Sequence, residues 1–270
     1  MTRVTLVAWH VFKESVRDRV LFAIAAFAIV LVAASVLIGQ ITAGQDVRII
    51  KNLGLATIEL SGVLMAVFIG VGLVAREIER RSIYSLLAKP LHRWEFVLGK
   101  YLGLCGTLIV NVALMSVALF LVLLWLQMTM PEGVVRASPA PPLDPALVKA
   151  LVLIVAELVL LTAVALLVST FSSSGVMSTV LTLGIWVVGL LSEDLRGFSN
   201  VATSPVVAWV VQLVGTIAPA FSAFDIKAEV VNGRPPVAWG YVGMTVLYAM
   251  TYAGALVGAA VAVFSRREFT

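Results

Sequence analysis

Residues 101–126, YLGLCGTLIVNVALMSVALFLVLLWL, contain no charged side chain. Roughly twenty helical residues cross the hydrocarbon core of a bilayer, which is about 30 Å thick, so this segment is long enough to span a membrane. The whole chain of 270 residues is 61% hydrophobic, with a mean hydropathy of +1.05. A water-soluble protein cannot bury that share of apolar side chains, because its surface must be largely wetted. The composition therefore predicts an integral membrane protein with several spans.

Six apolar segments predict an all-α polytopic protein with six transmembrane helices. They are Val20–Gly39, Leu53–Ala75, Tyr101–Leu126, Ala150–Ser169, Val176–Ser192 and Trp239–Phe264. Helices are expected because every backbone polar group must be paired within lipid, and no alternation typical of barrel strands is visible.

A seventh apolar stretch, 197–224, is interrupted by Pro205 and Pro219. The part between the prolines, Val206–Ala218, would reach only about 20 Å as a helix. We interpret it as a re-entrant or interfacial element before the last span, within an outer region at 193–238. If it crossed the membrane, there would be seven spans and the C-terminus would change sides.

The distribution of Lys and Arg favours six spans with both termini in the cytoplasm. In that topology the inner segments hold twelve of the nineteen Lys and Arg residues. Cytoplasmic segments of membrane proteins carry this excess. A seventh span would place Arg266 and Arg267 outside.

The N-terminal segment 1–19 is predicted to be an amphipathic helix on the membrane surface. Its apolar face is formed by Val4, Val7, Ala8, Val11, Phe12 and Val16. Its polar face contains His10, Lys13, Glu14, Arg17 and Asp18, with Trp9 near the border. Such a pattern is typical of an interfacial helix, and the alternative is an ordinary basic flank of the first span. The segment is too long for the charged start of a secretory signal, so we expect it in the mature protein.

Glu59 and Glu157 are the two ionisable residues within the predicted spans. Counting from the outer ends of their helices, Glu59 lies about 9 Å and Glu157 about 10 Å deep. A carboxylate at such a depth usually faces a cavity or a partner. The pair either lines a substrate path near its exit, or bonds as a protonated carboxyl to a neighbouring helix, or is exposed near the interface.

Several motifs are absent. The chain has no G-x-x-x-x-G-K-[ST] phosphate loop, and its single Cys and two His offer no catalytic set and no zinc or copper cluster. We expect no catalytic residue, no metal site and no nucleic-acid partner. Two small-xxx-small pairs, Gly99–Gly103 and Gly254–Gly258, match a pattern of close helix contact and are weak indicators of an oligomer interface.

The stretch AREIERRSIYSLLAKPLHRWEFVLGK, residues 75–100, concentrates charge between the second and third spans. Glu77 and Arg81 are spaced to pair on a helix that continues out of the second span. Pro90 disfavours helix at Lys89, so we expect two short helical pieces joined by a rigid elbow on the cytoplasmic side.

The pattern at Ala75–Gly103 resembles the ABC-2 type permeases, the membrane subunits of a class of ATP-binding-cassette transporters. It is most similar to the branch of gliding-motility and copper-enzyme-maturation permeases. The basic N-terminal helix, the sequence Ala218–Asp225 and the C-terminal Phe264–Phe269 also fit, so the resemblance covers nearly the whole chain as a single permease domain, 1–270. Arg81-Ser82 departs from the Gly-Thr of the family, and no His, Cys or Met cluster supports the copper label.

The resemblance implies a non-catalytic permease subunit of an exporter in the bacterial inner membrane. Its implied partners are two separate ABC ATPase subunits, which hold the ATP and Mg, a second and identical permease chain, membrane lipid and an outer accessory protein. The substrate would be a lipid, glycan, drug or peptide.

The resemblance also implies contact with the ATPase through residues 76–100 and through the N-terminal helix. The residues in question are Arg76, Glu77, Glu79, Arg80, Arg81, Lys89, Pro90, Arg93, Trp94 and Glu95, together with Trp9, Lys13, Glu14 and Arg17. The alternative functions are a stand-alone secondary transporter, a membrane scaffold or a metalloenzyme-maturation component.

Overall fold

The structure is a computed structural model, and it describes a chain of helices. The described residues are 3–41, 46–79, 92–129, 141–172, 174–194, 215, 218–235 and 237–266. They form the α-helices α1 (Arg3–Val16), α2 (Arg19–Ile41), α3 (Asp46–Glu79), α5 (Arg93–Thr129), α7 (Ala146–Phe171), α8 (Gly175–Leu190), α11 (Lys227–Asn232) and α12 (Trp239–Arg266), and the short 3₁₀ helix η1 (Phe221–Phe224). Among these residues there is no strand.

Each of the six predicted apolar segments lies mainly within a helix, but fewer than six qualify as spans by length and composition. Among the described residues, four do so: Val47–Val71, Trp94–Thr129, Ala146–Phe171 and Trp239–Ser265. A fifth is reached if α1 and α2, which meet at a bend of 58°, form one broken span. α8 has only 16 residues, or about 24 Å of rise. The described residues therefore contain four or five candidate spans, and the sixth span stays a prediction.

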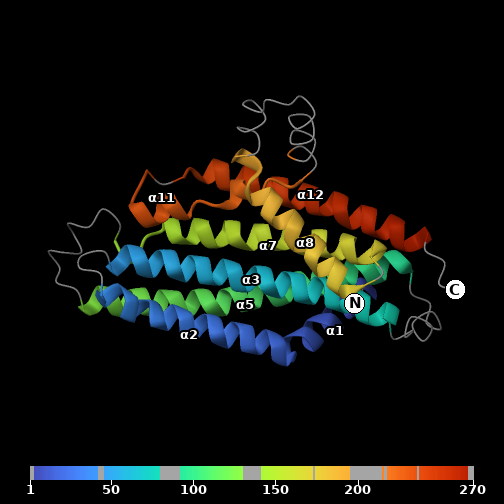
Figure 1. The fold of residues 1–270 in the computed structure, drawn as a ribbon, viewed down its shortest axis with the longest axis horizontal. Coiled ribbons are helices and arrows are strands. Elements are labelled where there is room, and N and C mark those ends of the chain that lie inside the picture. The colour runs from blue at the N-terminus through green and yellow to red at the C-terminus, as the bar shows by residue number, and fades with distance from the viewer. Residues whose placement is uncertain are drawn as a thin grey trace.

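The helices form an elongated bundle with both chain ends at one side (Figure 1). α2, α3, α5 and α7 run along the long axis, and each reverses the direction of the one before it. α7 occupies the centre, in contact with α3, α5, α8 and α12. In its apolar stretch 78% of the residues are buried within the chain, against 22% for α12. α12 therefore packs on the bundle with one face and leaves most of its surface exposed.

α1 packs on the first part of α5 through two glycines. A Cβ atom added to Gly99 would stand 2.7 Å from Cβ of Val7, and one added to Gly103 would stand 2.6 Å from the carbonyl oxygen of Ala8. A side chain at position 99 or 103 would not fit in that space. The two glycines of α5 therefore let α1 approach closely. The Gly99–Gly103 pair is thus used within the chain, not between chains. A Cβ at Gly254 would meet nothing within 4 Å.

A compact segment between α8 and α12 covers the end of the bundle opposite the termini. η1 lies against α8, where a Cβ at Gly189 would stand 2.4 Å from the carbonyl oxygen of Pro219. The Ala220 amide donates to the Tyr248 hydroxyl of α12 at 3.1 Å. α11 follows and ends at Gly233, whose φ of 62° is in the left-handed region that glycine adopts without strain. These contacts fix the start of α11 over α3 and α7. The predicted re-entrant helix Val206–Ala218 lies almost entirely outside the described residues.

Candidate functional site

Glu59 on α3 and Glu157 on α7 lie on two helices that pack closely together. A Cβ at Gly62 would stand 2.4 Å from Cδ1 of Leu158, so the helices approach each other just beside the two carboxyl groups. Both glutamates are buried, with 7% of Glu59 and 2% of Glu157 exposed. The two carboxyl groups are near enough to interact electrostatically. The structure therefore brings the two predicted residues together and rules out the alternative that they are exposed.

Lys227, the first residue of α11, provides the partner of Glu59. Its ammonium group forms an ion pair and hydrogen bond with the Glu59 carboxylate. Asp225 Oδ2 lies 3.6 Å from the Lys227 Nζ, and Asp225 Oδ1 accepts a hydrogen bond from the Lys227 amide at 3.0 Å. Burial alone would lower the pKa of the Lys227 ammonium group. The carboxylates, Glu59 first, outweigh this effect and raise that pKa above its ordinary value of 10.5, so the group stays charged at neutral pH.

Glu157 is held by a different element. The indole Nε1 of Trp186, on α8, donates a hydrogen bond of 2.8 Å to Glu157 Oε1. An indole N–H only donates, so it is a matched partner for a buried carboxyl oxygen. The two glutamates thus connect the central helices α3 and α7 to two peripheral elements, α11 through Lys227 and α8 through Trp186. Neither contact bears on whether the pair lines a substrate path, which stays a prediction.

A second group of charges lies near the same end of the bundle. Lys51 of α3 is fully buried, and its Nζ is 4.0 Å from Asp144 Oδ2 and has no hydrogen-bond partner among the residues that the structure describes. Asp144 also accepts a hydrogen bond of 2.8 Å from the amide of Ala146, in the first turn of α7. Lys149 donates to the carbonyl of Val237 at 2.7 Å and lies over the ring of Trp239. These lysines tie the loops at this end to α3 and α7.

The helix ends that carry the described part of the predicted ATPase-contacting residues lie at the opposite end, where both termini lie (Figure 1). Arg76, Glu77 and Glu79 belong to the last turns of α3, and Arg93 begins α5. Arg80, Arg81, Lys89 and Pro90 lie outside the described residues, so the predicted elbow stays a prediction.

The start of α5 shows one specific role. Glu95 Oε2 accepts a hydrogen bond of 3.0 Å from the amide of His92, the residue before the helix. This is the contact that a glutamate at the third helical position makes in a capping box. Glu95 therefore stabilises the start of α5, and Trp94 beside it is 49% exposed.

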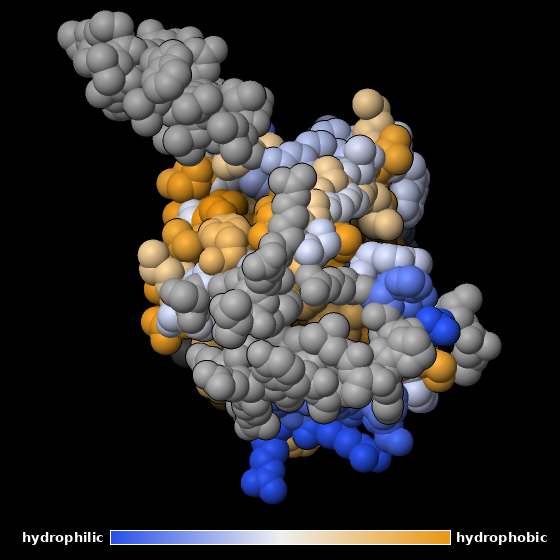
Figure 2. Space-filling view, turned by 90° about the vertical axis from the view of Figure 1, so that its right-hand side faces the viewer, coloured by the Kyte–Doolittle hydropathy of each residue, from blue (hydrophilic) through white to orange (hydrophobic). Residues whose placement is uncertain are grey.

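α1 presents its polar residues at this same end. His10, Lys13, Glu14 and Arg17 are exposed, and Trp9 is 60% exposed, whereas Val11 is buried. Figure 2 looks onto this end and shows hydrophilic residues along its lower edge, the level at which α1 lies in Figure 1. Val16, predicted for the apolar face, is 46% exposed. The amphipathic helix on a membrane surface stays a prediction.

Residues 5–268 match the family described as ABC-2 family transporter protein. The chain belongs to the ABC-2 transporter family. Membership makes it a multi-pass membrane protein and a transport component of a kind that is generally not itself catalytic. It also implies an ABC ATPase as a partner. A comparison with curated proteins gave no match.

Sequence reasoning found both glutamates of this ABC-2 protein but missed Lys227, Trp186 and the buried Lys51. Lys227 follows Asp225 in a polar stretch just before the last span, which marks it as a residue of the outer region. Nothing in the spacing predicts that this stretch folds back onto α3. Trp186 lies in an apolar run, where an indole is more often packing than a donor to a carboxyl group.

Proposed function

We propose that the chain is the membrane subunit of an ATP-driven exporter in a bacterial inner membrane, with both termini in the cytoplasm. A pair of separate ATPase subunits would bind at the end that carries α1, the last turns of α3 and the start of α5. A second, identical permease chain would complete the core. The substrate would be a lipid, glycan, drug or peptide. We also expect the outer face to accept an accessory protein.

The observation that carries the proposal is the direct contact between α1 and α5 at that end. Val7 and Val11 of α1 pack directly against Gly99 and Gly103 of α5. A displacement of α1 by a bound ATPase would therefore move the start of α5, since close-packed elements shift as rigid bodies.

α3 supplies a second route. It runs without interruption from Asp46 to Glu79. The twenty positions from Glu79 to Glu59 correspond to about 30 Å of helix. A displacement of the last turn of α3 would move Glu59, which lies within the same helix. The ion pair would pass this movement to Lys227 of α11. ATP hydrolysis at the end that carries the termini would in this way loosen or tighten the packing of α11 at the opposite end.

Reversing the charges of Glu79 and Arg80 together tests this coupling. The variant Glu79→Lys/Arg80→Glu, reconstituted with its ATPase, should assemble but show lower transport-coupled ATP hydrolysis. The matched control reverses one acid and one base outside the predicted contact residues, Glu193→Lys/Arg234→Glu, both of which are exposed. Equal coupled activity in the two variants would contradict the proposal.

Purification separates this function from the alternatives. An exporter subunit should co-purify with an ATPase that carries a phosphate loop. If the chain purified alone and drove ion-coupled uptake in vesicles, it would be a secondary transporter instead. Retention of a metal by the purified chain would favour the maturation component.

A further inference from the structure

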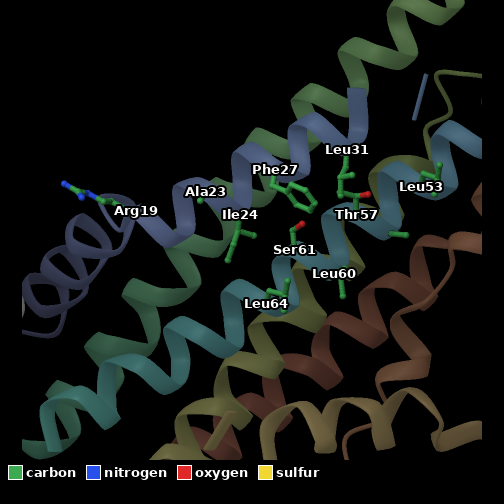
Figure 3. A pocket seen from close by; sticks show the side chains of 11 residues that line it. Arg19, Ala23, Ile24, Phe27, Leu31, Leu53, Thr57, Leu60, Ser61 and Leu64 are labelled. Atoms are coloured by element: carbon green, nitrogen blue, oxygen red, sulfur yellow. The ribbon is translucent and has the colours of Figure 1, made fainter. Parts of the chain in front are cut away.

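A groove of about 580 Å³ lies between α2 and α3, on the outside of the bundle (Figure 3). Phe27 and Leu31 of α2 and Thr57 and Ser61 of α3 point toward it from its two sides. Small side chains, including Ala23 on α2, leave the space open between the helices. The groove is distinct from the Glu59–Lys227 site, because neither residue lines it.

The groove opens outward, where a membrane protein meets lipid. Phe27 is 61% exposed and Leu31 39% exposed, so both would contact the surroundings of the chain. α3 contains a candidate span over Val47–Val71, which includes every α3 residue of the groove. An empty apolar groove in hydrocarbon loses van der Waals contacts on both of its walls. It is therefore expected to hold an apolar occupant.

The length of the groove matches one leaflet of a bilayer. Its α2 side extends from Arg19 to Leu31, which is about 18 Å along a helix. One leaflet contributes about half of a hydrocarbon core of about 30 Å. A single acyl chain lying along the groove would thus enter at one membrane surface and end near the middle of the membrane.

The volume also favours an acyl chain over a helix. An 18 Å length of helix with a diameter of about 10 Å occupies about 1,400 Å³. The groove, at about 580 Å³, is smaller than that. A helix of a second copy could insert only a few side chains, whereas a lipid tail could lie within the groove.

Charge at the end of the groove selects the headgroup. Arg19 is the single charged residue among those that line it, and it lies at the surface end, beyond Ala23 (Figure 3). Asp18 beside it does not line the groove. A guanidinium group binds phosphate oxygens through paired hydrogen bonds, and its long stem can reach the headgroup region from a helix in lipid.

From this combination we propose that the groove between α2 and α3 binds one anionic phospholipid, with its phosphate at Arg19 and an acyl chain along Phe27 and Leu31. The site lies in the leaflet next to the end that carries both termini. It does not depend on the proposed coupling to an ATPase.

Lipid binding to the delipidated chain in neutral detergent tests the site. Native mass spectrometry would compare phosphatidylglycerol with phosphatidylcholine of the same acyl chains, and inorganic phosphate would be added alone in a thermal-unfolding assay. The variant Arg19→Gln removes the charge, with Arg48→Gln, in the first turn of α3, as the matched control. The variant Ala23→Trp fills the groove, with Ala33→Trp, at another exposed alanine of α2, as its control.

Wild type should bind phosphatidylglycerol about fivefold more tightly than phosphatidylcholine, the effect of about one basic residue at an anionic surface. Arg19→Gln should abolish this preference, and Ala23→Trp should weaken the binding of both lipids, while both controls behave as wild type. Inorganic phosphate should not stabilise the chain.

Three results would overturn the proposal. One is equal binding of the two lipids by wild type, or wild-type preference in Arg19→Gln. A second is stabilisation by inorganic phosphate alone that depends on Arg19, which would make the site an anion site without a lipid. A third is efficient disulfide cross-linking of two copies by Ala23→Cys in a Cys105→Ser background, which would make a second copy the occupant.

Discussion

Lys227 forms an ion pair with Glu59 although 168 positions separate them in the chain. The pair joins a short helix at the end of the bundle to the middle of a candidate span. Glu59 is 9% and Lys227 19% exposed at the side chain, so the contact is shielded from solvent without being fully enclosed.

Breaking this pair should release α11 from the bundle. In Glu59→Gln the Lys227 ammonium group loses the closer of its two carboxylate partners and keeps Asp225 at 3.6 Å. We expect a loss of about 1.5–3 kcal/mol, the usual range for hydrogen bonds to charged groups. The measurement is hydrogen exchange of residues 218–235, which should speed up while α7 stays protected. Arg234→Gln, at an exposed residue, is the control. Unchanged exchange in Glu59→Gln would show that the pair does not hold α11.

A double variant measures the interaction between Glu59 and Lys227 separately from the contribution of each side chain. Glu59→Gln/Lys227→Gln removes both charges, so it should be less destabilised than the sum of the two single variants. Additive losses in thermal unfolding would mean that the two charges act independently.

The contact between Trp186 and Glu157 should also contribute to stability. In Trp186→Phe the buried carboxyl oxygen loses its donor, which costs about 1–3 kcal/mol. Thermal unfolding of the purified chain would measure the loss. The same change in a Glu157→Leu background should cost less, because no buried carboxyl group is left without a partner. A full loss in that background would assign the effect to packing of the indole.

The fit of α1 on α5 predicts opposite outcomes for similar glycine substitutions. Gly103→Ala places a methyl group 2.6 Å from the carbonyl oxygen of Ala8, so α1 must shift, at a cost of about 1–3 kcal/mol. Gly106→Ala meets the ring of Phe12 at 3.5 Å, an ordinary contact, and should be neutral or stabilising because alanine favours helix. Limited proteolysis within α1 would report the shift. Equal protection of α1 in both variants would contradict the packing described here.

The raised pKa of Lys227 predicts how its contribution depends on pH. A group whose pKa is higher in the folded state stabilises fully below its unfolded pKa, here 10.5, and loses that contribution as pH rises through the folded value. The difference in thermal stability between wild type and Lys227→Met should therefore be constant from pH 7 to about 10 and narrow only above 10.5. If the stability difference between wild type and Lys227→Met already began to narrow near pH 8, the Lys227 ammonium group would not be held by carboxylates.

The sequence predicted the helices well where the length of an uncharged run set them. The predicted span Trp239–Phe264 corresponds to α12 at Trp239–Arg266, and Ala150–Ser169 corresponds to α7 at Ala146–Phe171. It placed the start of α3 too late, at Leu53 in place of Asp46. The apolar run starts after Lys51, but backbone hydrogen bonding continues past a charged side chain, and the bundle buries this one completely.

The sequence predicted the two glutamates of the candidate site but not their two partners. Glu59 and Glu157 stood out because an acid within an apolar run is costly and uncommon. Their depths matched because both helices start at the same side. Lys227 and Trp186 could not be found this way, since their roles depend on how α11 and α8 fold back onto α3 and α7. Pairing between distant segments is a property of tertiary packing, which local periodicity does not encode.

The packing of α1 on Gly99 and Gly103 also determines when, during synthesis, α1 can reach its final position. α1 leaves the ribosome before α5, and the surface of α5 on which it packs lies about ninety residues later in the chain. At a synthesis rate of about 5–20 residues per second, α1 waits roughly 5–20 s for that surface. During this interval the surface around the two glycines is not available to α1, so we expect the bilayer or a targeting factor to shelter its apolar side chains.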